Sequence, residues 1–166
     1  NEAAEVRVQL KLGFDLRRSA ASVELIRIAP DSDPIKLNAA VAASTGEVIC
    51  FVPEGASIAE QWVAPLAYEA LQPDVGAIGP KLVAASGELV SIGRVLEPTL
   101  TDRFVGEPSD SSGPWGAFFV VREVSTLAPI GFTIATATFD QLGGFGSGMS
   151  LDVAVADLSV RLAADG

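Results

Sequence analysis

The chain has no histidine, and this limits the chemistry that its residues could perform. Ser-His-Asp and Cys-His nucleophile systems are excluded from this chain, and so are zinc sites that contain histidine. The single cysteine, Cys50, lies in an apolar segment, and we interpret it as a small core residue. Any reaction must therefore use carboxylates, hydroxyls, Lys, Arg or a metal ion held by oxygen ligands.

Three acidic side chains lie beside elements that could position them. Glu54 follows the apolar segment Glu47–Val52, while Asp152 and Asp157 lie in a helix predicted from Leu151 to Ala164. A structural interpretation competes with a chemical one, because the dipole of a helix stabilises an acid in its first turn. Glu54 could equally be a solvated loop acid. Both interpretations stay open from the residues alone.

Composition and charge restrict the partners. The chain has 166 residues and a net charge of −10, and nucleic acid and anionic membranes are poor main partners because both are polyanions. No run reaches the ~18 apolar residues of a membrane span, and the N-terminus lacks a signal-peptide layout. We therefore expect no membrane span and a cytoplasmic location. Arg94 and Arg103 are interpreted as ordinary surface residues.

Hydrophobic periodicity predicts strands that alternate with helices. The predicted strands are Glu5–Leu10, Val23–Ile28, Glu47–Val52, Val75–Gly79, a hairpin of Lys81–Ala84 with Glu88–Ile92, Ala117–Val121 and Phe132–Ala137. The predicted helices are Phe14–Ala21, one capped by Asp33, one opened by the pattern Ser57-Ile58-Ala59-Glu60 with Pro65 as a kink or break, a turn at Phe139–Leu142, and Leu151–Ala164. This alternation predicts an α/β layered sandwich with a mainly parallel sheet.

Five short motifs in a fixed order resemble the family 2 glycosyltransferases, the sugar-nucleotide-dependent enzymes of the GT-A fold. They are Leu37-Asn38-Ala39-Ala40 before Gly46-Glu47, Trp62, Pro73 to Leu82 with the turn Ser86-Gly87, Phe139 to Phe145, and Val155 to Gly166 with Asp157 and Arg161. The resemblance implies one domain over residues 1–166 with the GT-A three-layer sandwich and a mixed, mostly parallel sheet. On this alignment the first strand and helix of the family are missing.

The resemblance also implies a metal-dependent donor site. In such enzymes a divalent cation held by carboxylates stabilises the departing diphosphate. The family's Asp-x-Asp triplet falls on Val52-Pro53-Glu54, which leaves Glu54 as the only side-chain ligand for Mg²⁺ or Mn²⁺. Asn38 and Glu54 would contact the nucleotide donor. The triplet is therefore degenerate.

The catalytic base implied by the resemblance is degenerate as well. In the family a second carboxylate takes the proton of the acceptor hydroxyl. That position falls on Val155, so Asp152 is the best remaining base, and Asp157 matches a second acid of the family's final helix. Trp115, in the long irregular segment Glu97–Gly116, could stack on an acceptor sugar or could anchor the segment to the rest of the domain.

The resemblance implies transfer of a sugar from a nucleotide donor to a glycan or a lipid-linked acceptor, if the chain is active. Because both motifs are degenerate, we favour a weak or inactive relative. The alternative is a non-catalytic module that binds a glycan or a partner protein. A further possibility is that the missing N-terminal elements belong to a longer parent chain. The sheet edge left by the missing strand predicts a dimer through that edge.

Overall fold

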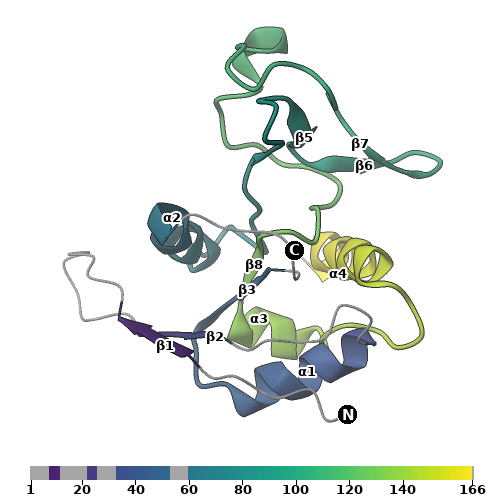
Figure 1. Ribbon diagram of the computed structural model, residues 1–166. Helices are drawn as coiled ribbons and strands as arrows, with labels where there is room; N and C mark the ends of the chain where they lie inside the picture. The colour runs from purple at the N-terminus through teal and green to yellow at the C-terminus, as the bar shows by residue number, and fades with distance from the viewer. Residues whose placement is uncertain (1–7, 12–21, 26–32, 53–59, 166) are drawn as a thin grey trace, which may run out of the picture.

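The computed structural model describes residues 8–11, 22–25, 33–52 and 60–165. These residues form four α-helices, short strands and one three-ten helix (Figure 1). The elements are β1 (Val8–Lys11), β2 (Ser22–Leu25), α1 (Pro34–Ala43), β3 (Val48–Phe51), α2 (Glu60–Ala70), β4 (Leu82–Val83), β5 (Leu89–Ser91), β6 (Arg94–Leu96), β7 (Leu100–Asp102), η1 (Pro114–Gly116), β8 (Phe132–Ala135), α3 (Thr136–Gln141) and α4 (Leu151–Asp165). None of the described helices has the length and apolar character needed to cross a bilayer.

The predicted GT-A sandwich with a mostly parallel sheet is wrong. The described strands form only two-stranded sheets, β1 with β2, β3 with β8, β4 with β5 and β6 with β7, and every pair is antiparallel. The apolar segment that includes β3 was expected between parallel neighbours, but Val48 pairs with Ala135 and Phe51 with Phe132 in an antiparallel register. Hydrophobic periodicity identifies a strand without giving its direction, so an apolar run that helices cover can be mistaken for part of a parallel sheet.

Several local predictions are confirmed. Asp33 caps α1, because its Oδ1 accepts a hydrogen bond from the backbone N–H of Ile35 at 3.0 Å, and Pro34 occupies the first turn. The hairpin around Ser86-Gly87 forms as β4 and β5. The C-terminal helix forms as α4, one residue longer than predicted. Short-range signals such as caps, turns and helix faces therefore gave the correct elements.

Other local predictions differ from the structure. Ala117–Val121 forms turns in place of a strand, and Val75–Gly79 contributes only a single bridge, between Ile78 and Thr133. Helix α2 continues through Pro65 without a break. The predicted helix Phe14–Ala21 and the first three residues of the Ser57–Glu60 capping pattern lie outside the described residues.

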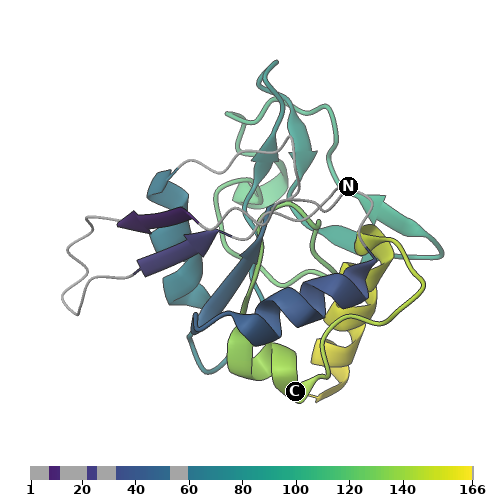
Figure 2. The ribbon, with the colours of Figure 1, turned by 60° about the horizontal axis from the view of Figure 1, so that its bottom comes forward.

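The buried core lies around the β3–β8 pair, and α1, α3 and α4 cover it (Figures 1 and 2). Its centre is aromatic: the ring centroids of Phe51 and Phe145 are 5.0 Å apart, and Phe132 is fully buried beside them. The buried members are Leu37, Val41, Phe51, Phe132, Ile134, Phe139, Phe145, Ala154, Val155 and Leu158. These elements are called the body below.

Cys50 lies in β3 as the sequence predicted, and its side chain is partly buried. Burial raises the pKa of the Cys50 thiol, and a hydrogen bond with Thr133 offsets only part of that effect. The thiol therefore stays protonated at neutral pH. The interpretation of Cys50 as a core residue is therefore confirmed only in part, because its side chain lies at the margin of the core.

Residues 81–126 form a unit of their own, called here the hairpin lobe, which contains β4 to β7 and η1 (Figure 1). Its interior is built from Leu89 and Phe118, both buried, with the ring of Phe104 edge-on to Phe118 at 5.2 Å. The backbone N–H of Leu89 donates to Glu107 O at 2.8 Å, and Leu89 O accepts from the N–H of Gly106 at 2.9 Å. The lobe therefore has its own small core and its own hydrogen bonds.

Candidate functional site

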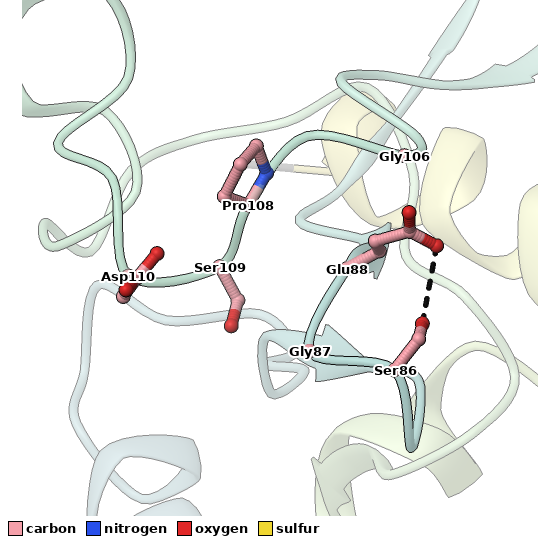
Figure 3. A pocket seen from close by; sticks show the side chains of 7 residues that line it. All are labelled: Ser86, Gly87, Glu88, Gly106, Pro108, Ser109 and Asp110. Atoms are coloured by element: carbon pink, nitrogen blue, oxygen red, sulfur yellow. Dashed lines mark hydrogen bonds between the residues drawn. The ribbon is translucent and has the colours of Figure 1, made fainter.

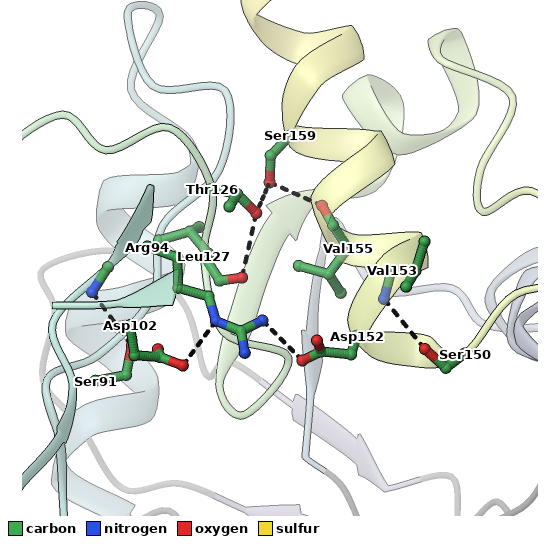
Figure 4. A network of polar contacts seen from close by, with 11 residues as sticks. Ser91, Arg94, Asp102, Thr126, Leu127, Ser150, Asp152, Val153, Val155 and Ser159 are labelled. Atoms are coloured by element: carbon green, nitrogen blue, oxygen red, sulfur yellow. Dashed lines mark hydrogen bonds and ion pairs between the residues drawn. The ribbon is translucent and has the colours of Figure 1, made fainter. Parts of the chain in front are cut away.

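Asp152, the best candidate for a base, is paired with an arginine of the hairpin lobe (Figure 4). It lies in the first turn of α4, and its Oδ1 accepts a hydrogen bond from Nη1 of Arg94 at 2.7 Å. Nε of the same guanidinium donates to Oδ2 of Asp102 at 3.0 Å. One arginine thus bridges two carboxylates from different parts of the fold, and the Asp152 carboxylate takes part in a structural contact.

Arg94 is the centre of this network, so its interpretation as an ordinary surface residue is wrong. Its side chain is only 12% exposed. Burial by itself lowers the pKa of Arg94, but the hydrogen bonds to Asp152 and Asp102 and the charges of both carboxylates outweigh it and raise that pKa above its ordinary value. The guanidinium therefore stays charged. Asp102 Oδ1 is buried and makes no hydrogen bond within the described part of the chain.

Asp157, the second candidate acid, pairs with Arg161 one turn later in α4. Its Oδ2 accepts from Nε and Nη2 of Arg161 at 2.9 and 2.7 Å. The guanidinium also donates to two backbone carbonyls after α3, with Nη1 bonding Leu142 O at 2.6 Å and Nη2 bonding Gly144 O at 2.8 Å. Asp157 thus orients an arginine that fixes the loop between α3 and α4, which is a structural role.

Asn38, predicted to contact a nucleotide donor, holds the next residue of the same loop. Its Nδ2 donates to Phe145 O at 2.8 Å, and its Oδ1 accepts from the N–H of Phe145 at 2.9 Å. Gly144 has a φ of 69°, and a Cβ there would lie 2.7 Å from Asn38 Oδ1, so this close approach requires glycine. The contacts of Asn38 and Arg161 with residues 142–145 are called the Arg161 cluster below.

The described residues do not form a metal site. They contain no group of three or more Cys, Asp or Glu side chains that could hold an ion. Glu54, the predicted ligand, lies outside the described residues, so its role stays a prediction. Val155, which occupies the family's base position, is fully buried in the core. The described residues therefore offer no preassembled set of protein ligands, and binding of Mg²⁺ or Mn²⁺ stays a prediction.

Trp115 projects from the hairpin lobe into solvent. It is the central residue of η1, its side chain is fully exposed, and its φ of 50° places it in the left-handed region. Gly113 and Gly116, on either side, also have positive φ. Phe118, which is 5% exposed, packs against Gly113 and anchors the segment. Phe118, and not Trp115, therefore anchors this segment. Stacking on a sugar is the interpretation of Trp115 that stays open.

A shallow groove lies on the same lobe (Figure 3), with a volume of about 390 Å³. It is lined by Ser86, Gly87, Glu88, Gly106, Pro108, Ser109 and Asp110. Lys81 joins the groove to the segment after Trp115, because its Nζ donates to Ser109 O at 2.9 Å and lies 5.0 Å from the centroid of the exposed Phe119 ring. Serine hydroxyls, carboxylates, an ammonium and aromatic faces thus gather on one lobe.

No family model matches the chain, and no curated protein or solved structure is significantly similar to it. The likeness to the family 2 glycosyltransferases therefore rests on the sequence motifs. Three of these motifs meet in the Arg161 cluster, since Asn38, the segment Phe139–Phe145 and Arg161 are joined there by hydrogen bonds. Within this cluster the motif residues have a structural role, because they join α1, α4 and the loop between α3 and α4.

Proposed function

We propose that this chain is a non-catalytic relative of the family 2 glycosyltransferases and binds a glycan through Trp115. The observation that carries the proposal is the fully exposed indole of Trp115, presented by a backbone in the left-handed region. A left-handed conformation costs a non-glycine residue free energy, and such strain clusters at ligand-binding and active sites. A large apolar side chain held out in water therefore points to a ligand.

The chemistry of the lobe favours a sugar as that ligand. An indole offers a flat apolar face with a polar N–H at its rim, which matches a sugar ring with its apolar C–H face and its hydroxyls. A groove on the same lobe supplies polar groups, with the hydroxyl of Ser86 and the carboxylates of Glu88 and Asp110.

The non-catalytic part of the proposal is supported by the partners of the candidate acids. Asp152 is paired with Arg94, and Asp157 is paired with Arg161. The position that carries the base in the family holds Val155, which is packed in the core. The relationship to the family is supported by the Arg161 cluster, because residues that match its motifs are the ones that join α1, α3 and α4. On this proposal the chain kept the family's structural residues and lost its chemical ones.

We expect Trp115→Ala to abolish or strongly weaken glycan binding. Removing a central aromatic contact typically costs about 2 kcal/mol, which is about a 30-fold increase in Kd. The chain should first be screened on an array of immobilised oligosaccharides, and each oligosaccharide that binds should then be titrated against wild type and variant by calorimetry. Folding should be unaffected, because Trp115 is fully exposed.

Trp62 provides a matched control, since it is the only other tryptophan and is 55% exposed on α2. Trp62→Ala should leave glycan affinity unchanged. In Trp62→Phe, Trp115 becomes the sole tryptophan, and its emission should shift to shorter wavelength when the oligosaccharide binds. Binding that survives in Trp115→Ala, or emission that does not respond, would overturn the assignment of Trp115.

A further inference from the structure

The hairpin lobe meets α4 through polar contacts (Figure 4). Arg94 of the lobe pairs with Asp152 at 2.7 Å, and Thr126 Oγ1 donates to Ser159 Oγ at 3.2 Å. By contrast, among the described residues the hairpin lobe contributes no side chain to the buried core of the body. Burial of apolar surface is the force that fixes packed elements rigidly against each other. The contacts described between the lobe and α4 are therefore polar, and they run from the buried Thr126 to the partly exposed carboxylate of Asp152.

Three of the four side chains in this contact, Arg94, Thr126 and Ser159, have a second partner. Nε of Arg94 is bonded at 3.0 Å to Asp102, which belongs to the lobe. Ser159 Oγ donates to Val155 O within α4 at 2.8 Å, and Thr126 Oγ1 lies 3.3 Å from Leu127 O. If the lobe moved away from α4, Arg94 would keep one carboxylate and Asp152, already 45% exposed, would be hydrated. Breaking a buried ion pair is usually costly because one charge stays buried without a partner. Separation of the lobe from α4 avoids this cost.

The chain crosses between body and lobe at one place. On the body side Ile78 and Thr133 exchange two backbone hydrogen bonds of 2.8 Å. On the lobe side Arg94 and Thr126 exchange two more, at 2.9 and 3.3 Å. Between these two bridges Gly79 lies against Leu127, so closely that a Cβ on Gly79 would be 3.2 Å from Leu127 Cδ2. Rotation between the bridges would move the lobe as one unit without breaking either of them.

We propose that the hairpin lobe is hinged at Gly79 and Leu127, and that the Arg94–Asp152 ion pair latches it to α4. In the closed state the lobe covers this side of α4. In the open state Asp152 and Ser159 face water, and Trp115 changes its position relative to the body. The proposal does not depend on what Trp115 binds, and it holds whether or not the chain binds a glycan.

The latch can be tested by measuring the distance between body and lobe. Nitroxide labels are placed at Lys36→Cys on α1 and Arg103→Cys on the lobe, both exposed, in a Cys50→Ala background. Double electron–electron resonance then gives the distance distribution with and without Asp152→Asn. An ion pair with one partly exposed member is worth about 1 kcal/mol, so the variant should raise the ratio of open to closed molecules about fivefold.

Asp157→Asn is the matched control, since it breaks a second aspartate–arginine pair on the same helix but within the body. It should leave the distance distribution unchanged. Wild type in 1 M NaCl should shift in the same direction as Asp152→Asn, because salt screens an exposed pair. A distribution that is identical in wild type and Asp152→Asn would overturn the latch. Equal broadening by Asp152→Asn and Asp157→Asn would overturn it too, because it would indicate general loosening.

Discussion

Arg161→Met is expected to lower the free energy of unfolding by about 3 kcal/mol. The substitution removes two hydrogen bonds from a charged donor to the carbonyls of Leu142 and Gly144, at 2.6 and 2.8 Å. Bonds of this kind contribute roughly 1.5–3 kcal/mol each, and the 32% exposure of the Arg161 side chain argues for the lower end of that range. Methionine keeps most of the apolar stem, so lost packing contributes little. Urea denaturation followed by circular dichroism measures the change.

The contribution of Asp157 can be separated from that of the carbonyl contacts. Asp157→Asn removes only a partly exposed pair between residues four apart on a helix, which is worth about 0.3–0.5 kcal/mol. It should therefore cost less than about 1 kcal/mol. Arg161→Lys keeps the charge but cannot reach both carbonyls and Asp157 together, and it should fall between the two. A cost in Asp157→Asn equal to that of Arg161→Met would contradict the structural role assigned to the carbonyl contacts.

Phe132→Ala is expected to cost about 3–5 kcal/mol, the largest effect of a single substitution predicted for this chain. The ring of Phe132 is fully buried, 6.0 Å from the ring centroid of Phe51 and 6.4 Å from that of Phe145. The residue also pairs with Phe51 across the β3–β8 ladder. Alanine would leave a cavity at the place where the strand pair and the aromatic centre meet. The urea midpoint should fall while the slope of the transition stays constant.

Phe119→Ala serves as the control, because it makes the same substitution at a ring that is 64% exposed. It should change stability by less than about 1 kcal/mol, through loss of the contact with Lys81. The free energy of unfolding of a domain of this size is about 5–15 kcal/mol, so Phe132→Ala alone would remove a large part of it. A small effect of Phe132→Ala would mean that the β3–β8 pair is not the centre of the core.

Features encoded within a few residues were predictable. Asp33-Pro34 specified the start of α1 because a capping carboxylate and a proline suit the first turn of a helix. Ser86-Gly87 specified a hairpin because Gly87, with a φ of 88°, adopts a conformation open to glycine. The apolar face of α4 was equally clear, since Val155 and Leu158 recur at helical spacing and both are fully buried. Each of these signals acts within the element that carries it.

The arrangement of the strands was not predictable in this way. The apolar run at β3 is compatible with parallel or antiparallel neighbours, and its actual partner, β8, lies more than 80 residues away. The alternation of strand and helix favoured a parallel sheet. A parallel pair needs a crossover connection of about a dozen residues or more. The β4–β5 and β6–β7 pairs are instead joined by short hairpins, which make them antiparallel. The family resemblance carried the same error into the predicted fold.

The candidate site was predictable only in part. Trp115 was singled out from the sequence because an aromatic side chain in a long polar segment needs an explanation, and its role as a sugar contact stays a prediction. Arg94 was missed, because its partners Asp102 and Asp152 lie 8 and 58 residues away and no local pattern links them. The contact between Asn38 and Phe145 spans 107 residues. One signal could have revealed it, since both residues belong to motifs that occur in the same order in the family.

Whether this chain handles a nucleotide sugar is tested most directly by calorimetry. The full chain is titrated with UDP, GDP and dTDP in the presence and absence of Mn²⁺, with Mn²⁺ alone as the control. We predict no metal-dependent binding of any of the three nucleotides, because on the proposal above the metal-binding triplet is degenerate and the carboxylates of Asp152 and Asp157 are paired with arginines. Mn²⁺-dependent binding with a micromolar Kd, about −8 kcal/mol, would contradict the non-catalytic assignment and restore a donor site that includes Glu54.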